Sequence, residues 1–274
     1  LKLLLTNAQV RIFASFHHQQ VVAVALGLVE GQASTEQIEL MAQSKSRLKD
    51  QFLPQSLYLH NGLENAFDYH YLRIMRIAVH PLVQQSGIGT RLLSEIKNIA
   101  LAEQFDMLGT SFGATPELLS FWFSANYQTV RLGFTCDQAS GEHSALLLHP
   151  LNDQADEQLT QLTVEFFSSF NFYLSDQFQQ LSPRLIVQII SHWPKPHLPN
   201  LSEQDQKSVH NYVDKKRLYH PCLFSLNSWL MHYISNNHGE VADFLIARLL
   251  QRRTTKDICR IYGFSGKKML EQQS

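Results

Sequence analysis

The sequence predicts a mixed α/β fold over residues 1–150 and an all-helical segment over residues 151–274. Two observations support this division. In the first part, apolar runs that suit strands alternate with stretches whose apolar residues recur every three or four positions. In the second part, only the helical spacing recurs. With 44% apolar residues, the 274-residue chain can bury the cores of two ordinary domains.

The first elements are expected to be a helix end and a pair of strands. Residues 1–5 resemble the tail of a helix, and residues 11–17 and 21–29 suit two antiparallel strands. Residues 30–71 then form a long polar connection, a length that is often functional. The residues that interrupt this connection are Pro54 and Gly62.

A strand, a turn and a helix meet in the middle of the α/β part. Residues 72–79 form an apolar run that Pro81 should end, because proline fixes φ and donates no hydrogen bond. The turn at residues 84–90 leads into an amphipathic helix that should cover the sheet. The apolar positions of that helix are Leu92, Leu93, Ile96, Ile99 and Ala100.

The remaining α/β elements follow from apolar runs and helix caps. Residues 107–112 suit a strand. Thr115 and Pro116 suit the N-cap and the first position of a strongly apolar helix. Residues 129–134 and 143–148 suit two closing strands joined by a polar turn.

The turn at residues 84–90 has the composition of an anion-binding loop. A helix start leaves backbone N–H groups unpaired at the positive end of the helix dipole, so main chain alone can hold a pyrophosphate. Gly87 and Gly89 would allow a left-handed turn and a close approach of the anion. Two glycines at this spacing also serve helix–strand packing, so the pattern alone leaves both interpretations open.

Composition and charge exclude several classes. The net charge of −1 gives no overall attraction to nucleic acid, so any basic surface must be local. The three cysteines are far apart, which argues against a disulfide framework and favours a reducing compartment such as the cytoplasm. No signal peptide, membrane span or HExxH-like metal motif is found. Because the chain opens at Leu1 rather than Met, we expect a fragment of a longer protein.

The segment at residues 76–81 and the turn after it resemble motif A of the Gcn5-related N-acetyltransferases (GNAT). Gln84, two residues, Gly87, one residue and Gly89 match the pattern of that motif. The resemblance implies a mixed sheet flanked by helices, here lacking its first strand, and acetyl transfer from acetyl-CoA. It implies that the backbone of Ile77, Ala78 and Val79 runs beside the pantetheine arm like an added strand. The turn residues implied to hold the pyrophosphate are Gln84, Gln85, Ser86, Gly87, Ile88, Gly89 and Thr90.

Four segments together resemble a narrower family, the bacterial tRNA(Met) cytidine acetyltransferases. These are residues 52–57, 76–81 and 111–118, and Phe121-Trp122. The resemblance implies acetylation of N4 of the wobble cytidine of elongator tRNA(Met), with ATP or GTP used by a helicase-like module. No GxxxxGK[ST] phosphate loop occurs in this chain, so that module is expected upstream of Leu1.

The same resemblance places Glu117 among the acetyl-CoA contacts, but it does not extend to every position. Ser124 stands where the family often has an arginine, and Asn126-Tyr127 replaces a usual Gly-Phe, so ionic contacts from that helix to the coenzyme phosphates are not carried over. Glu117 and His80 are the catalytic candidates, with Tyr127 as a third titratable group. Glu117 also suits a helix start with no ligand, and His80 suits a strand end packed on proline.

The second half is expected to contain only helices. Residues 155–181 have the spacing of a helix or a helix pair, and residues 192–200 form a proline-rich connection. Ser202 and Asp205 suit a capping box at the start of a helix that reaches Leu218. Two further helical patterns are residues 225–234 and 241–250.

The end of the chain carries its one concentrated charge, seven basic against two acidic residues from Arg248 onwards. This segment suits tRNA binding through phosphates, a solvated helix face, or a helix-turn-helix at residues 255–270 with Gly263 at the turn. The RNA-binding candidates are Lys45, Arg47, Lys49, Arg252, Arg253, Lys256, Lys267 and Lys268. Two other functions stay open: a protein or small-molecule N-acetyltransferase, and a nucleic-acid-binding regulator with an acyl-CoA-sensing domain.

Overall fold

The computed structural model describes residues 6–44, 47–193, 201–236 and 241–273. The described residues form two compact units. The first unit holds the chain up to Ala114 together with Ser120–Leu162, and the second holds Thr115–Leu119 together with the chain from Thr163 onwards. The domain bounds predicted from the sequence, 1–150 and 151–274, stay a prediction.

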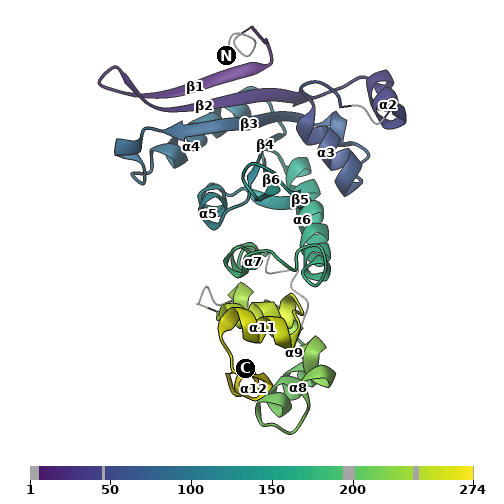
Figure 1. Ribbon diagram of the computed structural model, residues 1–274. Helices are drawn as coiled ribbons and strands as arrows, with labels where there is room; N and C mark the ends of the chain where they lie inside the picture. Colours follow the sequence, from purple (N-terminus) through teal and green to yellow (C-terminus); the bar gives the residue numbers. More distant parts are fainter. Residues whose placement is uncertain (1–5, 45–46, 194–200, 237–240, 274) are drawn as a thin grey trace. The chain divides into compact units, whose positions relative to one another are not determined.

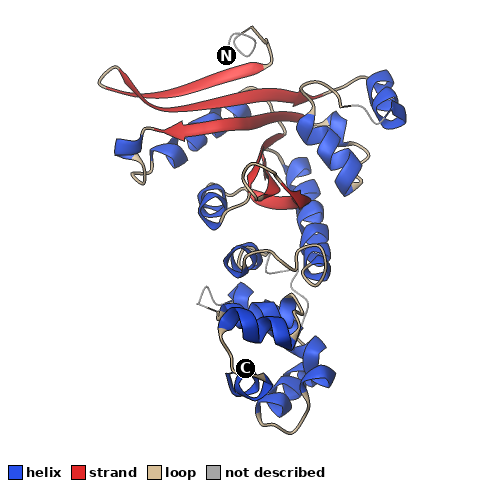
Figure 2. Cartoon of the chain, in the orientation of Figure 1, coloured by secondary structure: helices blue, strands red, loops and turns tan. Residues whose placement is uncertain are grey.

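In the described residues of the first unit, six strands form one mixed sheet, drawn in red in Figure 2. The strand order is β1-β2-β3-β4-β6-β5, and only β3 and β4 pair in parallel. The mixed sheet with flanking helices and the helical second part confirm the predicted fold class. The strands are β1 (Val10–His17), β2 (Gln20–Gly31), β3 (His70–Val79), β4 (Met107–Gly113), β5 (Gln128–Cys136) and β6 (His143–Pro150).

The parallel pair β3 and β4 separates part of the way along its length. The two strands are paired from Tyr71 opposite Met107 to Ile74 opposite Thr110. Beyond Ile74, β3 continues to Val79 paired only with β2, and β4 continues to Gly113 paired only with β6. Among the residues that the structure describes, the edge of β3 that faces β4 therefore has no strand partner over its last five residues.

The long polar connection predicted for residues 30–71 is wrong, because this stretch contains helices. They are α2 (Thr35–Ser44), α3 (Phe52–Asn61) and a short 3₁₀ turn, η1 (Ala66–Asp68). Pro54 lies in the first turn of α3, where a missing N–H removes no helical hydrogen bond. Gly62 ends α3 in the left-handed conformation, with φ +67°. The two residues taken as breakers thus lie at the two ends of one helix.

Most other predicted elements of the first unit are confirmed. The strands expected at residues 11–17 and 21–29 pair antiparallel. The helix expected from Thr90 is α4 (Ile88–Ala102), and it packs along β1, β2 and β3 (Figure 1). The helix expected after Thr115 is α5 (Pro116–Ser124), and the Thr115 hydroxyl accepts a hydrogen bond from Leu118 N–H at 3.3 Å. Residues 1–5 lie outside the described residues.

The core of the first unit joins α3, the sheet and the start of α6 (Asp153–Tyr173). Leu53 and Leu57 of α3 are completely buried, as are Tyr71 and Met107 of the sheet. Ala155, Leu159 and Leu162 of α6 belong to the same cluster. This core fixes the strands that carry the candidate site.

Helices alone form the second unit in the part of the chain that the structure describes. The capping box is confirmed, since Asp205 N–H donates to the Ser202 hydroxyl at 3.1 Å, but its helix ends at Val213 rather than Leu218. A short helix, α7, was not predicted, and the connection at residues 192–200 lies mostly outside the described residues. The helices are α7 (Pro183–Ile190), α8 (Glu203–Val213), α9 (Tyr219–Asn236), α10 (Asp243–Leu245), the π-helical turn η4 (Ile246–Leu250), α11 (Thr255–Tyr262) and α12 (Lys267–Gln273). None of the helices described is both long enough and apolar enough to cross a membrane.

Candidate functional site

The strand β3 ends in a short 3₁₀ turn, η2 (Pro81–Val83), that the sequence builds from His80 and Pro81. His80 N–H donates to the Val22 carbonyl at 2.8 Å, and its side chain Nδ1 accepts from Leu82 N–H at 3.3 Å. His80 therefore caps the turn, with the lone pair of Nδ1 engaged.

The turn at residues 84–90 is held by its own side chains. The Gln84 amide donates to the Val79 carbonyl at 3.0 Å, and the Ser86 hydroxyl donates to the Val83 carbonyl at 2.5 Å. Gln85 and Gly87 both adopt positive φ, at 60° and 79°. These contacts fix the backbone that delivers the chain into α4.

The start of α4 is open to an anion. Gly87 is the N-cap residue and has no side chain to accept from the first helical N–H groups, and no acidic residue lies in the first turn. The unpaired N–H groups and the positive end of the helix dipole are therefore not neutralised locally. This arrangement suits a phosphate or pyrophosphate held by main chain.

The two glycines of the turn have different structural roles. A Cβ at Gly87 would meet no atom within 4 Å, so its requirement is the left-handed φ. A Cβ at Gly89 would lie 3.1 Å from the Phe121 ring and 3.3 Å from Val79 Cγ2. Gly89 therefore lets α4 pack closely on β3 and α5. The packing interpretation fits Gly89, whereas Gly87 has the left-handed conformation that the anion-binding prediction requires.

The last residues of β3 run beside this turn. Ile77, Ala78 and Val79 pair with Ala25, Val24 and Ala23 of β2 on one side. On the other side no strand of the described residues pairs with them, because the pairing of β3 with β4 stops at Ile74. An extended ligand with amide groups could add to this edge as a strand does.

The catalytic candidates stand in different surroundings. Glu117 is exposed in the first turn of α5, in the second compact unit, where the helix dipole favours a carboxylate. The Tyr127 hydroxyl is buried and without a hydrogen-bond partner. Burial raises the pKa of Tyr127, so the phenolate needed for a base is disfavoured.

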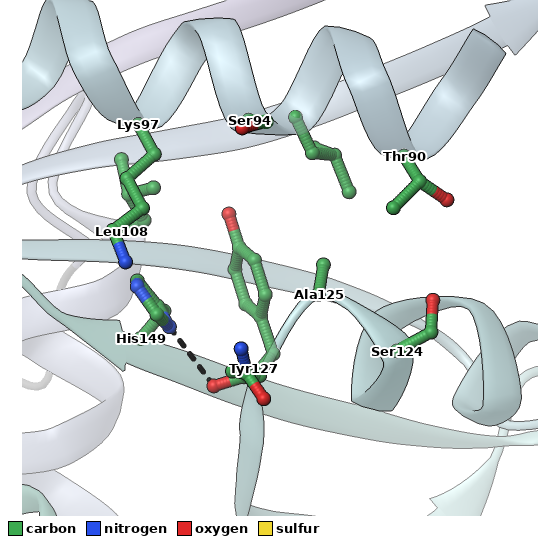
Figure 3. Close-up of a pocket in the computed structure, with 10 residues that line it drawn as sticks. Thr90, Ser94, Lys97, Leu108, Ser124, Ala125, Tyr127 and His149 are labelled. Atoms are coloured by element: carbon green, nitrogen blue, oxygen red, sulfur yellow. Dashed lines mark hydrogen bonds between the residues drawn. The ribbon is translucent and has the colours of Figure 1, made fainter. Parts of the chain in front are cut away.

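A cavity of about 200 Å³ lies beside α4 in the first unit (Figure 3). It was not predicted from the sequence, because its polar residues come from separate elements and form no motif. The available signal was polar residues in apolar patterns, namely Lys97 on the inner side of α4 and His149 at the end of an apolar strand. The residues that line it are Thr90, Leu93, Ser94, Lys97, Leu108, Ser124, Ala125, Asn126, Tyr127 and His149.

His149 is buried in the wall of this cavity. Its Nδ1 lies 2.9 Å from the Asn126 carbonyl oxygen, so Nδ1 carries the proton, and the buried Nε2 has no partner. Burial lowers the pKa of His149 by more than the hydrogen bond to the Asn126 carbonyl raises it, and the charge of Lys97 also lowers it. The imidazole is therefore neutral with its Nε2 lone pair unpaired.

The predicted RNA-binding residues fall in both units. In the first, Arg47 and Lys49 are exposed, and Lys45 lies outside the described residues. In the second, α11 and α12 lie on either side of Gly263, which ends α11 in the left-handed conformation with φ +74°. Of the predicted residues there, the exposed ones are Arg252, Lys256, Lys267 and Lys268. Lys267 Nζ lies 3.6 Å from a carboxylate oxygen of Glu271.

Two arginines of the basic segment have structural partners instead. Arg253 is half-buried and donates from Nε to the Gln179 carbonyl at 2.9 Å. Arg248 is buried, with its guanidinium 4.2 Å from the centre of the Tyr219 ring. Fewer cations are therefore available to a ligand than the charge count indicates.

Comparison with known proteins shows what this chain is similar to. Residues 92–152 match the model of the family described as GNAT acetyltransferase 2. The chain is 33% identical, over 97% of its length, to a tRNA(Met) cytidine acetyltransferase TmcA of Nitrosococcus halophilus, and 28% identical, over 98%, to one of Vibrio cholerae. It spans 37% of the length of each of these relatives.

Among solved structures, the Escherichia coli ribosomal-protein-S18-alanine N-acetyltransferase aligns with 54% of this chain and 73% of its own, at 11% identity and a TM-score of 0.36. Arabidopsis thaliana NAA60 in complex with acetyl-CoA aligns with 54% of this chain and 79% of its own, at 11% identity and a TM-score of 0.37. The sequence matches confirm the resemblance inferred from the motifs: the chain is a relative of the tRNA(Met) cytidine acetyltransferases and carries a GNAT acetyltransferase domain.

Proposed function

We propose that this chain transfers the acetyl group of acetyl-CoA to N4 of a cytidine in tRNA(Met), forming N4-acetylcytidine. The observation that carries the proposal is the uncapped start of α4 beside the unpaired edge of β3. The names of the relatives supply the acceptor. We further propose that the cytidine is the wobble base of the elongator tRNA, and that ATP or GTP hydrolysis in a module outside this chain drives the reaction.

The coenzyme would bind along β3 and the start of α4. The backbone of Ile77, Ala78 and Val79 would run beside the amides of the pantetheine arm, along an edge without a strand partner among the described residues. The Val79 carbonyl on this stretch already accepts from the Gln84 amide. The N–H groups after Gly87 would hold the pyrophosphate. The other turn residues, Gln84, Gln85, Ser86, Ile88, Gly89 and Thr90, would shape this cradle.

In the reaction a C–N amide bond forms and the C–S thioester bond breaks, with the proton from the amine ending on the departing thiol or on solvent. The exocyclic amine of cytosine is a weak nucleophile, because its lone pair is delocalised into the ring. Orientation and stabilisation of the tetrahedral oxyanion should therefore contribute most of the rate. The edge of β3 and the start of α4 would hold the coenzyme in the orientation that the reaction needs.

Of the catalytic candidates, Glu117 suits proton removal better than His80. Neutral His80 uses its Nδ1 lone pair as an acceptor for Leu82 N–H, so its Nε2 carries the proton. That tautomer has no free lone pair. Glu117 is an exposed carboxylate with no hydrogen bond to the described residues that would have to break. We propose Glu117 as a base or a coenzyme contact, and His80 as a cap of the turn.

The RNA would be held through phosphates. Arg252, Lys256, Lys267 and Lys268 are exposed around the α11–α12 turn, which supports residues 151–274 as a tRNA-binding tail. Arg47 and Lys49 of the first unit, with Lys45, would add contacts near the acetyl transfer site. Arg253 would serve the fold of the tail rather than the ligand.

The test is to incubate the protein with labelled acetyl-CoA, bulk tRNA and ATP, and to digest the RNA to nucleosides. We expect label in N4-acetylcytidine and none when elongator tRNA(Met) is removed from the pool. Label in protein or small amines with none in RNA would favour the alternative of a protein or small-molecule N-acetyltransferase. Coenzyme binding without any transfer would favour an acyl-CoA-sensing regulator.

A further inference from the structure

The cavity beside α4 is small and runs along one helix. Its α4 wall starts at Thr90, in the first turn, and ends at Lys97. Seven residues of helix correspond to about 10 Å at a rise of 1.5 Å per residue. Its volume of about 200 Å³ is below the roughly 300–1,000 Å³ of pockets that enclose a whole small ligand. The cavity therefore suits one end group of a larger molecule that lies partly outside it.

Two buried polar groups in the cavity wall have no partner. The Tyr127 side chain points from the loop after α5 toward α4, with its hydroxyl between Ser94 and Lys97 (Figure 3). Tyr127 is only 3% exposed, and its hydroxyl makes no hydrogen bond. His149 Nε2 is likewise buried and unpaired. Buried polar groups in folded proteins are nearly always satisfied, so these two indicate a polar occupant.

The remaining polar groups of the cavity fit an anion. Lys97 is half-buried, and none of the ion pairs made by the described residues includes it. Thr90 and Ser94 add hydroxyl groups, whereas the Ser124 hydroxyl donates to the Phe121 carbonyl at 2.7 Å, and no carboxylate lines the cavity. One ammonium group with the hydroxyls of Thr90, Ser94 and Tyr127 and no acid suits a phosphate group.

We propose that this cavity takes the ribose 3′-phosphate of the coenzyme, with Lys97 as its cationic partner and Tyr127 as a hydrogen-bond donor. The inference rests on the proposed function. Coenzyme A carries this phosphate on the same nucleotide as its pyrophosphate, so the two groups must bind close together. Thr90 lines the cavity and lies three residues after Gly87, where the proposed pyrophosphate cradle begins.

The test compares acetyl-CoA with acetyl-3′-dephospho-CoA by isothermal titration calorimetry. For the wild-type chain we expect acetyl-CoA to bind about tenfold more tightly, the ratio that corresponds to about 1.4 kcal/mol. Lys97→Met should lower the affinity for acetyl-CoA to that of the wild-type chain for the dephospho form. It should leave the affinity for the dephospho form unchanged. Tyr127→Phe should lose part of the same discrimination while keeping the packing. Lys207→Met, an exposed charge on α8, is the matched control and should change neither affinity.

Equal binding of both coenzymes by the wild-type chain, or an equal loss of both in Lys97→Met, would overturn the inference and leave the proposed function standing. No binding of either coenzyme by the wild-type chain would overturn both. If Lys97→Met weakens tRNA binding and keeps the coenzyme discrimination, the cavity serves an RNA phosphate and the inference is wrong. A thermal melt of each variant identifies loss of folding. If Lys97→Met does not fold, Tyr127→Phe with unchanged discrimination overturns the inference.

Discussion

The Nε of Arg73 lies 2.6 Å from Oε1 of Glu30, in an ion pair whose carboxylate is completely buried. The other oxygen of Glu30 accepts from Leu53 N–H at 2.7 Å, so one carboxylate joins β2, β3 and the start of α3. The Arg73 guanidinium also lies 5.1 Å from the centre of the Phe52 ring. This pair docks α3 onto the sheet at the point where the sequence predicts only a polar connection.

Replacing Arg73 by Met should destabilise the protein strongly. The change leaves the Glu30 charge buried without its partner, which typically costs about 3–5 kcal/mol of unfolding free energy. Urea denaturation at neutral pH measures the loss. Arg11→Met is the matched control, because Arg11 and Glu103 form an exposed pair at 3.9 Å that should contribute at most about 0.5 kcal/mol. Equal losses in the two variants would contradict the assigned role of the buried pair.

The same carboxylate should make stability depend on pH. Burial raises the pKa of Glu30 above its ordinary 4.5 by more than Arg73 lowers it. A group whose pKa rises on folding stabilises the fold fully below its unfolded pKa, and this contribution is lost as the pH rises through the folded pKa. Glu30→Gln removes the ionisation. The unfolding free energy of the Gln variant should therefore rise relative to wild type as the pH increases above the ordinary pKa of 4.5.

Urea titrations of both proteins across that pH range give the difference. A difference that stays constant or falls with pH would show that the pKa of Glu30 is not raised. Glu103→Gln is a useful control, because Glu103 is nearly half exposed and its pair is weak.

The elements of the sheet could be predicted because their signals are local. Apolar runs, proline and glycine give the strands and α4, and Thr115 with Pro116 gives the start of α5. Helix α3 was missed because Pro54 and Gly62 have the same local meaning inside a loop as they have at the first turn and the C-cap of a helix. Only burial of the residues between them distinguishes the two cases, and burial is a tertiary property.

The candidate site also has a part that could be predicted from local sequence and a part that could not. The glycine turn is contiguous, so its residues could be predicted together. The cavity needs α4, the loop after α5 and β6 to converge, and its residues are far apart in the chain. For the basic segment, the sequence overestimates the charge available to a ligand. Arg248 and Arg253 count toward that charge in the sequence, whereas in the structure each has an internal partner.

Three substitutions at Gly87 separate the effect of the backbone conformation from the effect of an added charge. Gly87→Ala meets no neighbour but must adopt φ +79°, which should cost about 1–2 kcal/mol of unfolding free energy. Gly87→Asn should cost less, because asparagine tolerates the left-handed conformation. Gly87→Asp matches the Asn side chain in shape and adds a negative charge where the pyrophosphate is proposed to bind. We therefore expect the Asp variant to bind acetyl-CoA at least tenfold more weakly than the Asn variant.

Thermal melts and calorimetric titration check the two parts of this prediction. Gly89→Ala serves as a comparison, because its Cβ would crowd the Phe121 ring and should affect packing first. If the Asp and Asn variants bind acetyl-CoA equally, the α4 start does not hold the pyrophosphate.

The exposed cations of the tail should govern the salt dependence of tRNA binding. Neutralising Lys256, Lys267 and Lys268 together should weaken tRNA binding and lower the slope of log affinity against log salt by about 0.7 to 0.9 for each RNA phosphate that the variant no longer neutralises. Arg253→Ala should instead lower the melting temperature, because it removes the hydrogen bond to the Gln179 carbonyl. Filter binding across a salt series measures the slope, and Lys207→Gln is the control for removal of one exposed charge elsewhere in the tail. A triple variant with an unchanged slope would exclude the α11–α12 surface as a major RNA-binding surface. Arg47 and Lys49 would then be the candidates for the main phosphate contacts.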